Sequence, residues 1–317
     1  MIKERESYLQ VSAPLRLSIA GGGTDLPEWY RSKPAHLLSV ALGFRIRVTV
    51  QTRSEATVVD SFKSELVQLF EKRNPSATVI AIDSEVSPGS GLGGSGALAV
   101  ALVAAELELI DGVQDPEWIA LEAYRWEREL LGNSVGFQDQ SVAALGSCVE
   151  MNAAPGEVIS LKTRPDLLSG LARLRHESLI LVGTDRNRKA DSVLADLAKN
   201  LTKDPVDSVG GLVTVAEAIE VISLADGQRF GELLRRHWKA KLELNPHAAT
   251  PEANEILELA HQSGQFGGKL VGAGGGGYVL LSGASIKKPL VVKALESSGY
   301  GVSPFFVSPN GVEVEIS

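Results

Sequence analysis

The sequence predicts an α+β protein of two domains, and three observations support this class. Short apolar runs bounded by turn residues, typical of strands, alternate with longer runs of helical pattern. The length of 317 residues allows one large domain or two ordinary ones. Proline, serine and glycine gather at residues 163–170, so we expect the domains to be residues 1–168 and 169–317.

The first half of the chain is rich in strand patterns around one strong helix. Residues 97–105 are apolar on all sides, which predicts a buried helix. A second helix is expected to begin at Asp115, which can cap it, with Pro116 in the first turn, and to end near Gly132. The expected strands are residues 15–19, 37–41, 46–51, 78–81, 148–151 and 158–161.

The second half mixes long helices with short strands. Its order of strand, helix, strand, strand, helix and strand suits a layer of helices on a sheet. The expected helices are residues 206–224, 230–242, 251–263 and 289–297. The expected strands are residues 178–182, 269–271, 278–281 and 311–316.

The composition argues against several classes of protein. A net charge of −8 argues against a nucleic-acid or anionic-membrane surface, although it is compatible with a local basic pocket for one phosphorylated ligand. Cys148 is the single cysteine, which excludes an internal disulfide and a cysteine-based zinc site. The first ten residues lack an apolar signal core, and no run of about 18 apolar residues is present. We expect a cytoplasmic protein that binds neither nucleic acid nor membrane.

Glycines gather in three clusters, at residues 21–23, 89–96 and 272–277. The second cluster runs directly into the apolar helix. Consecutive N–H groups of a glycine loop, together with the positive end of a helix, form an anion site suited to nucleotide phosphates. The segment lacks the P-loop and dinucleotide patterns, and a flexible turn before a helix is the alternative interpretation.

Three segments resemble, in order, the motifs of the GHMP kinases, the superfamily of galactokinase, homoserine kinase, mevalonate kinase and phosphomevalonate kinase. Residues 88–97 (PGSGLGGSGA) resemble the second motif, P-x-G-x-G-L-G-S-S-x-A. Residues 13–27 (APLRLSIAGGGTDLP) resemble the first motif in its sugar-kinase form, and residues 267–278 (GGKLVGAGGGGY) resemble the third. The segments AGGGTDLPE, GFQDQ and GGKLVGAGGGG are most similar to those of the D-glycero-D-manno-heptose 7-phosphate kinases.

The resemblance implies a fold and an activity. The fold is an N-terminal domain like ribosomal protein S5 domain 2 and a ferredoxin-like C-terminal domain. The activity is ATP- and Mg²⁺-dependent phosphorylation of the anomeric hydroxyl of a heptose 7-phosphate, giving heptose 1,7-bisphosphate for nucleotide-activated heptose synthesis. Alternatives are another anomeric kinase, for galactose, fucose or an octose phosphate, and a non-catalytic sensor of ATP and sugar. We expect a monomer or homodimer whose ligands are ATP and a sugar phosphate.

The second motif assigns the nucleotide site. Family members place a magnesium-contacting hydroxyl at the position of Ser95. This chain has Gly94-Ser95-Gly96 where the family usually has two or three serines. Gly94 removes one hydroxyl but adds freedom to the loop, so we expect a changed ATP affinity rather than a lost site. The ATP-binding residues implied by the resemblance are Pro88, Gly89, Ser90, Gly91, Leu92, Gly93, Gly94 and Ser95.

Three charged residues are candidates for phosphoryl transfer, which needs positioning, a metal and a base for the attacking hydroxyl. Asp139, in the GFQDQ segment, matches the catalytic aspartate of the family, and a helix N-cap is the alternative. Glu127 matches the magnesium glutamate by its spacing, and a helix-surface glutamate is the alternative. Arg16 matches the basic residue of the first motif, which can stabilise the transferred group, or it is a solvent-facing arginine at a strand edge.

The acceptor site is expected between the first and third motifs. Asp25 matches an aspartate that accepts hydrogen bonds from sugar hydroxyls, and a turn cap is the alternative. Arg188 matches an arginine of the heptose kinases and would bind the distal phosphate, with Arg186, Lys189 and Lys241 as further candidates. The substrate-binding residues are Gly22, Gly23, Thr24, Asp25, Asp139, Arg188, Gly274 and Gly275.

Overall fold

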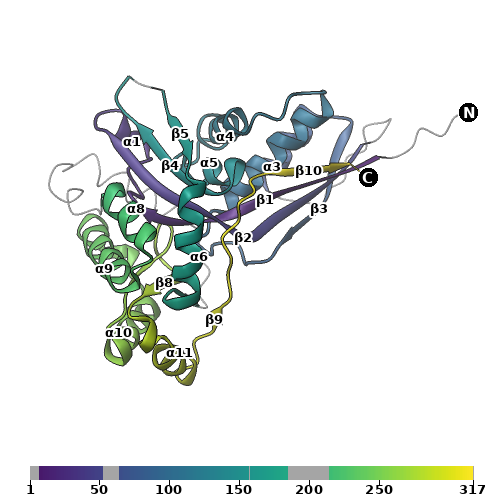
Figure 1. Cartoon of the computed structure of the whole chain (residues 1–317). Coiled ribbons are helices and arrows are strands. Elements are labelled where there is room, and N and C mark those ends of the chain that lie inside the picture. Colours follow the sequence, from purple (N-terminus) through teal and green to yellow (C-terminus); the bar gives the residue numbers. More distant parts are fainter. Residues whose placement is uncertain (1–6, 53–63, 157, 185–213, 317) are drawn as a thin grey trace, which may run out of the picture.

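The computed structural model describes residues 7–52, 64–156, 158–184 and 214–316 (Figure 1). Two antiparallel sheets with helices packed on them make up these residues, which confirms the α+β class. The larger sheet lies in the upper part of Figure 1, and the smaller sheet lies in the lower part. The expected helix at residues 206–224 lies partly outside the described residues.

The larger sheet has the strand order β10-β1-β2-β4-β5, with β3 also paired to β2. The sequence predicted two strands in the region of β2, which is one continuous strand. Gly43, between the two predicted strands, makes no turn there: its amide donates to the carbonyl of Phe306 at 2.8 Å, and Phe306 packs against it. The strands are β1 (Ser7–Ala20), β2 (Ala35–Thr52), β3 (Ala77–Ser84), β4 (Cys148–Ala153), β5 (Ser160–Thr163) and β10 (Glu313–Ile316).

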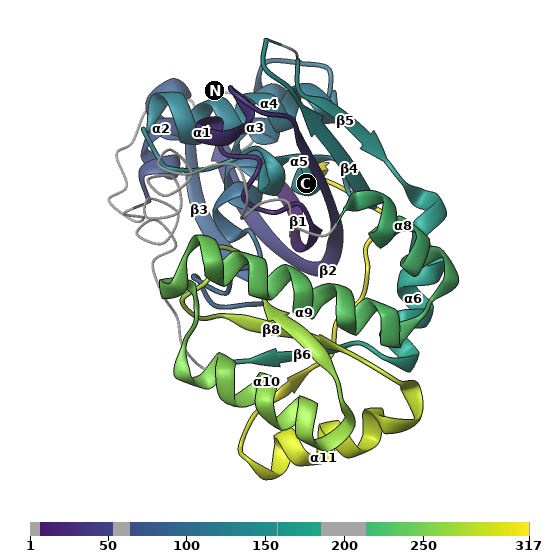
Figure 2. The ribbon, with the colours of Figure 1, turned by 90° about the vertical axis from the view of Figure 1, so that its left-hand side faces the viewer.

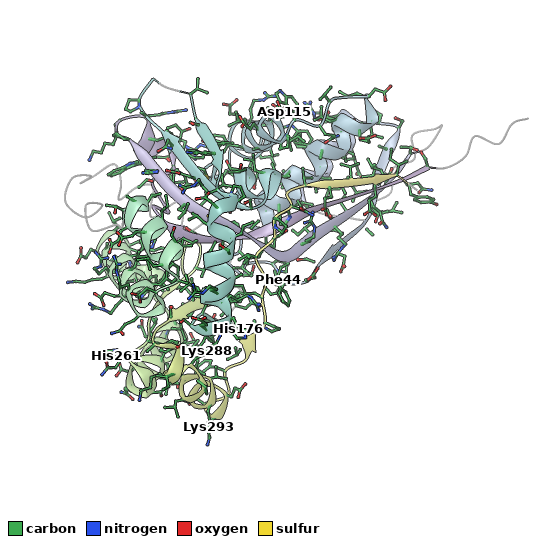
Figure 3. The ribbon with its side chains drawn as sticks, in the orientation of Figure 1. Phe44, Asp115, His176, His261, Lys288 and Lys293 are labelled. Atoms are coloured by element: carbon green, nitrogen blue, oxygen red, sulfur yellow. The ribbon has the colours of Figure 1, made fainter. Side chains whose placement is uncertain are left out.

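Helices α3, α4 and α5 form the layer above this sheet, and α3 and α5 contact its strands (Figure 1). The prediction of a buried helix is confirmed, because α3 buries every residue of its apolar centre except Leu98. Asp115, labelled in Figure 3, caps α4 by accepting from the amides of Glu117 and Trp118. The helices of this half are α1 (Pro27–Tyr30), α2 (Glu65–Arg73), α3 (Gly94–Leu109), α4 (Pro116–Arg125), a π-helical turn (Trp126–Leu130) and α5 (Gln138–Leu145).

The smaller sheet has the order β7-β8-β6-β9. The sequence did not predict α6; Ser169 and Gly170 are weak helix formers. Gly170 lets α8 approach α6, because a Cβ there would lie 2.1 Å from the Ile222 carbonyl oxygen. The elements are α6 (Leu168–Glu177), β6 (Ile180–Gly183), α8 (Val215–Leu224), α9 (Gly227–Leu244), α10 (Pro251–Gly264), β7 (Gly267–Leu270), β8 (Tyr278–Ser282), α11 (Lys288–Ser297) and β9 (Val302–Ser303). None of the helices in the described part of the chain is long and apolar enough to cross a membrane.

The two sheets are joined by packed helices rather than by a bare linker. Figure 2 shows α9 running between the β1–β2 sheet and the β6–β8 sheet. One apolar cluster extends from Leu17 of β1 to Phe230 and Leu233 of α9. The last strand, β10, returns to pair with β1. The division into residues 1–168 and 169–317 stays a prediction.

Lys288 ties the start of α11 to the end of α6. Its Nζ donates to the carbonyls of Arg175 at 2.8 Å and His176 at 3.0 Å, and Figure 3 shows Lys288 next to His176. Helix α11 is thus anchored to α6, which packs against α8. The two glycine loops that build the site lie elsewhere, one between β3 and α3 and the other between β7 and β8.

Candidate active site

The glycine loop at residues 88–95 lies between β3 and the start of α3. Gly89, Gly91 and Gly93 have φ of 79°, 76° and 79°, a region that favours glycine. Gly93 is the N-cap residue of α3, and no side chain caps that end of the helix. The first amides of α3 therefore remain available to an anion, together with the positive end of the helix dipole.

The third glycine cluster lies directly against this loop. A Cβ on Gly91 would stand 2.7 Å from the carbonyl oxygen of Val271, and a Cβ on Gly277 would stand 2.1 Å from that of Ser90. Residues 272–277 connect β7 to β8, so they form a hairpin turn, and they also contact the phosphate loop. Gly274 and Gly275 lie against Ala248, whose carbonyl accepts from the Gly275 amide at 2.8 Å.

Arg16 and Asp139 form an ion pair beside the start of α3. Arg16 Nε donates to Asp139 Oδ1 at 2.7 Å, and Arg16 Nη2 lies 2.6 Å from the same oxygen. A third guanidinium nitrogen donates to the carbonyl of Gly91 at 2.5 Å. The Arg16 side chain is only 8% exposed, so the interpretation as a solvent-facing arginine is wrong.

Asp139 occupies the first turn of α5 but does not cap it. The N-cap position is Phe137, without a side-chain cap, so the N-cap interpretation of Asp139 is wrong. The start of α3 approaches Asp139 closely, since a Cβ on Gly96 would lie 2.6 Å from Asp139 Cβ. A serine at position 96 would displace this carboxylate unless the backbone moved.

Glu127 and Ser95 meet on the other side of the same helix start. Ser95 Oγ donates to Glu127 Oε1, and Gln140 Nε2 donates to Glu127 Oε2 at 2.5 Å. Glu127 is fully buried, so the interpretation as a helix-surface glutamate is wrong. It lies in the π-helical turn Trp126–Leu130, an irregularity often found at functional sites.

The loop after β1 holds Asp25 beside Asp139. Asp25 Oδ1 accepts from the amide of Gly23 at 3.1 Å, and Oδ2 accepts from the amide of Gln138 at 3.4 Å. Burial, followed by the nearby Asp139 charge, raises the pKa of Asp25 to about 6. A Cβ at Gly136 would lie 1.9 Å from Asp25 Oδ2, so glycine is required there.

The remaining predicted residues fall at the rim or outside the described residues. Gly22 and Gly23 are partly exposed at this loop, and Thr24 Oγ1 donates to the Gly21 carbonyl at 2.8 Å. Pro88 is exposed at the entrance to the glycine loop. Arg188, with Arg186 and Lys189, lies outside the described residues, so its role stays a prediction.

Sequence reasoning missed two polar residues of the site. Gln140, which bonds Glu127, belongs to the GFQDQ segment but was not singled out. Lys269 is 3% exposed, and its Nζ donates to the Ile19 carbonyl at 3.0 Å. Lysine and glutamine are rarely buried. Lys269 stands before the apolar residues Leu270 and Val271, and Gln140 follows Asp139, and these positions could have indicated a role in the site.

Comparison with known proteins identifies the family. The models for the GHMP kinases N terminal domain and the GHMP kinases C terminal match residues 59–147 and 216–284. A D-glycero-alpha-D-manno-heptose 7-phosphate kinase of Campylobacter jejuni is 26% identical over 96% of this chain and 98% of its own length. A bifunctional fucokinase/GDP-fucose pyrophosphorylase of Arabidopsis thaliana is 26% identical over 88% of this chain but only 30% of its own length.

A solved structure has the same fold over almost the whole chain. A D-glycero-D-manno-heptose 1-phosphate kinase from Bacteroides thetaiotaomicron superposes with a TM-score of 0.68, at 20% identity, over 97% of this chain and 98% of its own. The expected two-domain fold is therefore confirmed. The matched family models cover the glycine loop and the third glycine cluster, whose contact builds the site. The chain belongs to the GHMP kinases and is an ATP-dependent phosphotransferase with an alcohol group as acceptor.

Proposed function

We propose that the chain is a sugar kinase that transfers the γ-phosphate of ATP to the anomeric hydroxyl of a heptose 7-phosphate, giving heptose 1,7-bisphosphate. The observation that carries the proposal is the Arg16–Asp139 ion pair, which lies against the open start of α3. The full-length likeness to the heptose 7-phosphate kinase of Campylobacter jejuni supports the choice of acceptor.

The glycine loop would bind the phosphates of ATP. The start of α3, with no side-chain cap, offers N–H groups and a positive dipole end to the β- and γ-phosphates. The contact of Gly91 with Gly272 brings the third cluster over the same place. The ATP would therefore lie with its γ-phosphate toward Asp139.

Asp139 would orient the acceptor hydroxyl and take its proton. As the hydroxyl oxygen forms a bond to the γ-phosphorus, the bond from that phosphorus to the β-phosphate oxygen breaks, and ADP leaves. The hydroxyl proton passes to the Asp139 carboxylate. Arg16, bonded to both Asp139 and the Gly91 carbonyl, would hold the carboxylate in place and offset negative charge on the transferred group.

Ser95 and Glu127 fit a magnesium ion. Their donor set is a hydroxyl and a carboxylate, the hard oxygen ligands that Mg²⁺ prefers, and they already meet at the start of α3. When bound, the ion would neutralise charge on the phosphates. Gln140 would keep the Glu127 carboxylate oriented through its hydrogen bond to Oε2.

The loop at residues 22–25 would bind the sugar. An ionised Asp25 can accept hydrogen bonds from two hydroxyls, and Gly22 and Gly23 leave room for a ring close to the backbone. Arg188 would bind the distal phosphate, as the sequence predicts. The competing candidate, an anomeric kinase for an unphosphorylated sugar, is favoured by the likeness to the fucokinase enzyme.

A phosphate-transfer screen over sugars and sugar phosphates tests the proposal, with the product position read by phosphorus NMR. We expect transfer to the anomeric oxygen, and a kcat/KM for heptose 7-phosphate roughly ten- to hundredfold above that for the free heptose. Arg188→Ala should shrink this preference, whereas Arg173→Ala, at an exposed arginine of α6, should not. Equal efficiency on both sugars in the wild type would favour the competing candidate.

A further inference from the structure

Four basic side chains gather where the two glycine loops meet. Arg16 comes from β1, Lys269 from β7, and His237 and Lys241 from α9. We propose that Lys241 is a phosphate-binding residue of this active site, one whose ammonium group contacts a phosphate of the bound substrates. The proposal builds on the phosphotransferase activity, and only the identity of the acceptor rests on the proposed function.

Lys241 lies next to the contact between the loops. Its Nζ donates to the carbonyl of Gly272. Gly272 in turn touches the phosphate loop, since a Cβ on it would lie 2.5 Å from the carbonyl oxygen of Gly91. Gly91 is the residue whose carbonyl Arg16 also bonds, at 2.5 Å. Only Gly272 thus lies between the ammonium group of Lys241 and the loop that we assign to the ATP phosphates.

Of the two lysines and the histidine, Lys241 is the one placed to reach a ligand. Lys269 and His237 are 3% and 2% exposed, whereas Lys241 is half-buried. Lys269 Nζ lies 2.7 Å from His237 Nδ1 and donates to the Ile19 carbonyl at 3.0 Å, so it is fixed between α9 and the end of β1. Among the residues that the structure describes, the ammonium group of Lys241 contacts only the Gly272 carbonyl and the Trp238 ring, whose centroid is 5.8 Å from its Nζ.

The charges around Lys241 favour an anion. Arg16 is paired with Asp139, but in the described part of the chain neither lysine forms an ion pair with a carboxylate. Burial, and then the charge of Arg16, lowers the pKa of Lys241 to about 7. Burial, and then the charge of Lys241, also lowers the pKa of Lys269, and the pKa of His237 is lowered by burial and then by Lys269. A phosphate placed here would relieve this repulsion and favour the protonated form of Lys241.

The phosphate has two possible sources, the γ-phosphate of ATP and the acceptor's own phosphate. Both would make the same charge-assisted hydrogen bonds with an ammonium group. The hydrogen bond of Lys241 to Gly272, which touches Gly91, suits the first source. Its place on α9, the helix whose His237 meets Lys269 at the end of β1, suits the second. Separate binding measurements distinguish them.

Isothermal titration calorimetry with the full chain tests the proposal. The probes are β,γ-imido-ATP with Mg²⁺, heptose 7-phosphate and the unphosphorylated heptose. Lys241→Met should weaken one phosphate probe, or both, by roughly ten- to hundredfold and leave the free heptose unchanged. The matched control is Lys239→Met, at an exposed lysine on the same helix, which should change nothing. The probe that weakens identifies the source of the phosphate.

Proton uptake separates a phosphate contact from a structural role. At pH 8 a lysine with a pKa near 7 is about nine-tenths neutral, so binding should take up close to one proton, measured in two buffers of different ionisation enthalpy. Lys241→Arg should keep the affinity but lose the uptake, because arginine is already protonated. If Lys241→Met does not fold, the affinity and the proton uptake of Lys241→Arg still test the proposal.

Two results would overturn the proposal. One is that Lys241→Met binds all probes as Lys239→Met does. The other is that it weakens phosphorylated and free heptose equally, which would indicate a packing role. Failure of the proposed acceptor would appear differently, as an absence of transfer to heptose 7-phosphate by the wild type, and the β,γ-imido-ATP titration would still test Lys241.

Discussion

Asp139 and Asp25 are neighbouring carboxylates held in opposite ways. Asp139 is paired with a guanidinium group, and its side chain is 30% exposed. Asp25 is buried, and its hydrogen bonds come from the backbone amides of Gly23 and Gln138. Burial and the charge of Asp139 raise the pKa of Asp25 to about 6. The positive charge of Arg16 holds Asp139 close to the phosphate loop, whereas backbone amides hold Asp25 in the loop after β1.

This difference means that the two residues should respond to different experiments. Removing the charge of Asp139 should mainly affect turnover, because its neighbours are Arg16 and the start of α3. Removing the charge of Asp25 should also affect stability, because an ionised carboxylate in a buried loop opposes folding. The following predictions test this contrast, in decreasing order of expected effect.

Asp139→Asn should lower kcat by about a hundredfold to ten-thousandfold, because the amide cannot take the hydroxyl proton. Binding of ATP, measured by calorimetry, should change little. Asp83→Asn, at a 76% exposed aspartate, is the matched control. Wild-type turnover in Asp139→Asn would mean that the ion pair with Arg16 is only structural.

Glu127→Gln should raise the magnesium concentration needed for half-maximal rate by roughly ten- to hundredfold. Ser95→Ala should have a smaller effect in the same direction, because a neutral hydroxyl contributes less than a carboxylate to a divalent ion. Rates measured over a magnesium titration check both variants. An unchanged metal requirement in both would remove these residues from the metal site.

Gly96→Ala should displace Asp139 and lower turnover by about tenfold, with a loss of about 1–3 kcal/mol in stability from overpacking. Its added Cβ would lie 2.6 Å from Asp139 Cβ. Gly301→Ala, outside the site, is the control, because an added Cβ there would meet no atom within 4 Å. Equal activity in the two variants would show that the start of α3 does not position Asp139.

Asp25→Asn should change how stability depends on pH. A raised pKa means that the acid form is favoured in the native state, so the Asp25 contribution is fully favourable below pH 4 and is lost as the pH rises through about 6. Over the whole titration, from well below pH 4 to well above pH 6, the free energy of unfolding of the wild type should fall by about 3 kcal/mol relative to that of the variant. Urea unfolding at pH 5 and pH 8 should record about half of this loss, because pH 5 already lies above the unfolded pKa of 3.8, and parallel pH dependences of the two proteins would contradict the prediction.

The sequence predicted the parts of the site that its motifs carry. Ser95, Glu127, Asp139 and Arg16 were named as candidates, and the structure brings them to the two sides of one helix start. Their roles in catalysis stay predictions. The helix at residues 97–105 was predicted because an all-apolar run needs a buried environment whatever surrounds it.

The rest depended on contacts between distant segments. One partner of Glu127, Gln140, is thirteen positions away in another helix, and Glu127 itself lies in a π-helical turn that no local pattern indicates. The effect of Gly96 is visible only once α5 lies against α3. The Lys269–His237 contact joins β7 to α9, so its burial could not be predicted from either segment alone.

The pairing of β10 with β1 has a consequence for synthesis of the chain. Leu9 of β1 pairs with Ile316 of β10, so this edge of β1 waits for a segment far along the chain. Until β10 leaves the ribosome, β1 remains an edge strand with unpaired backbone groups, a surface prone to wrong pairing with other chains. Closing so long a loop is slow as well as entropically costly. Completion of the larger sheet therefore depends on a late contact between distant segments, and shortening β10 should reduce the yield of folded protein more than the exposure of β10 suggests.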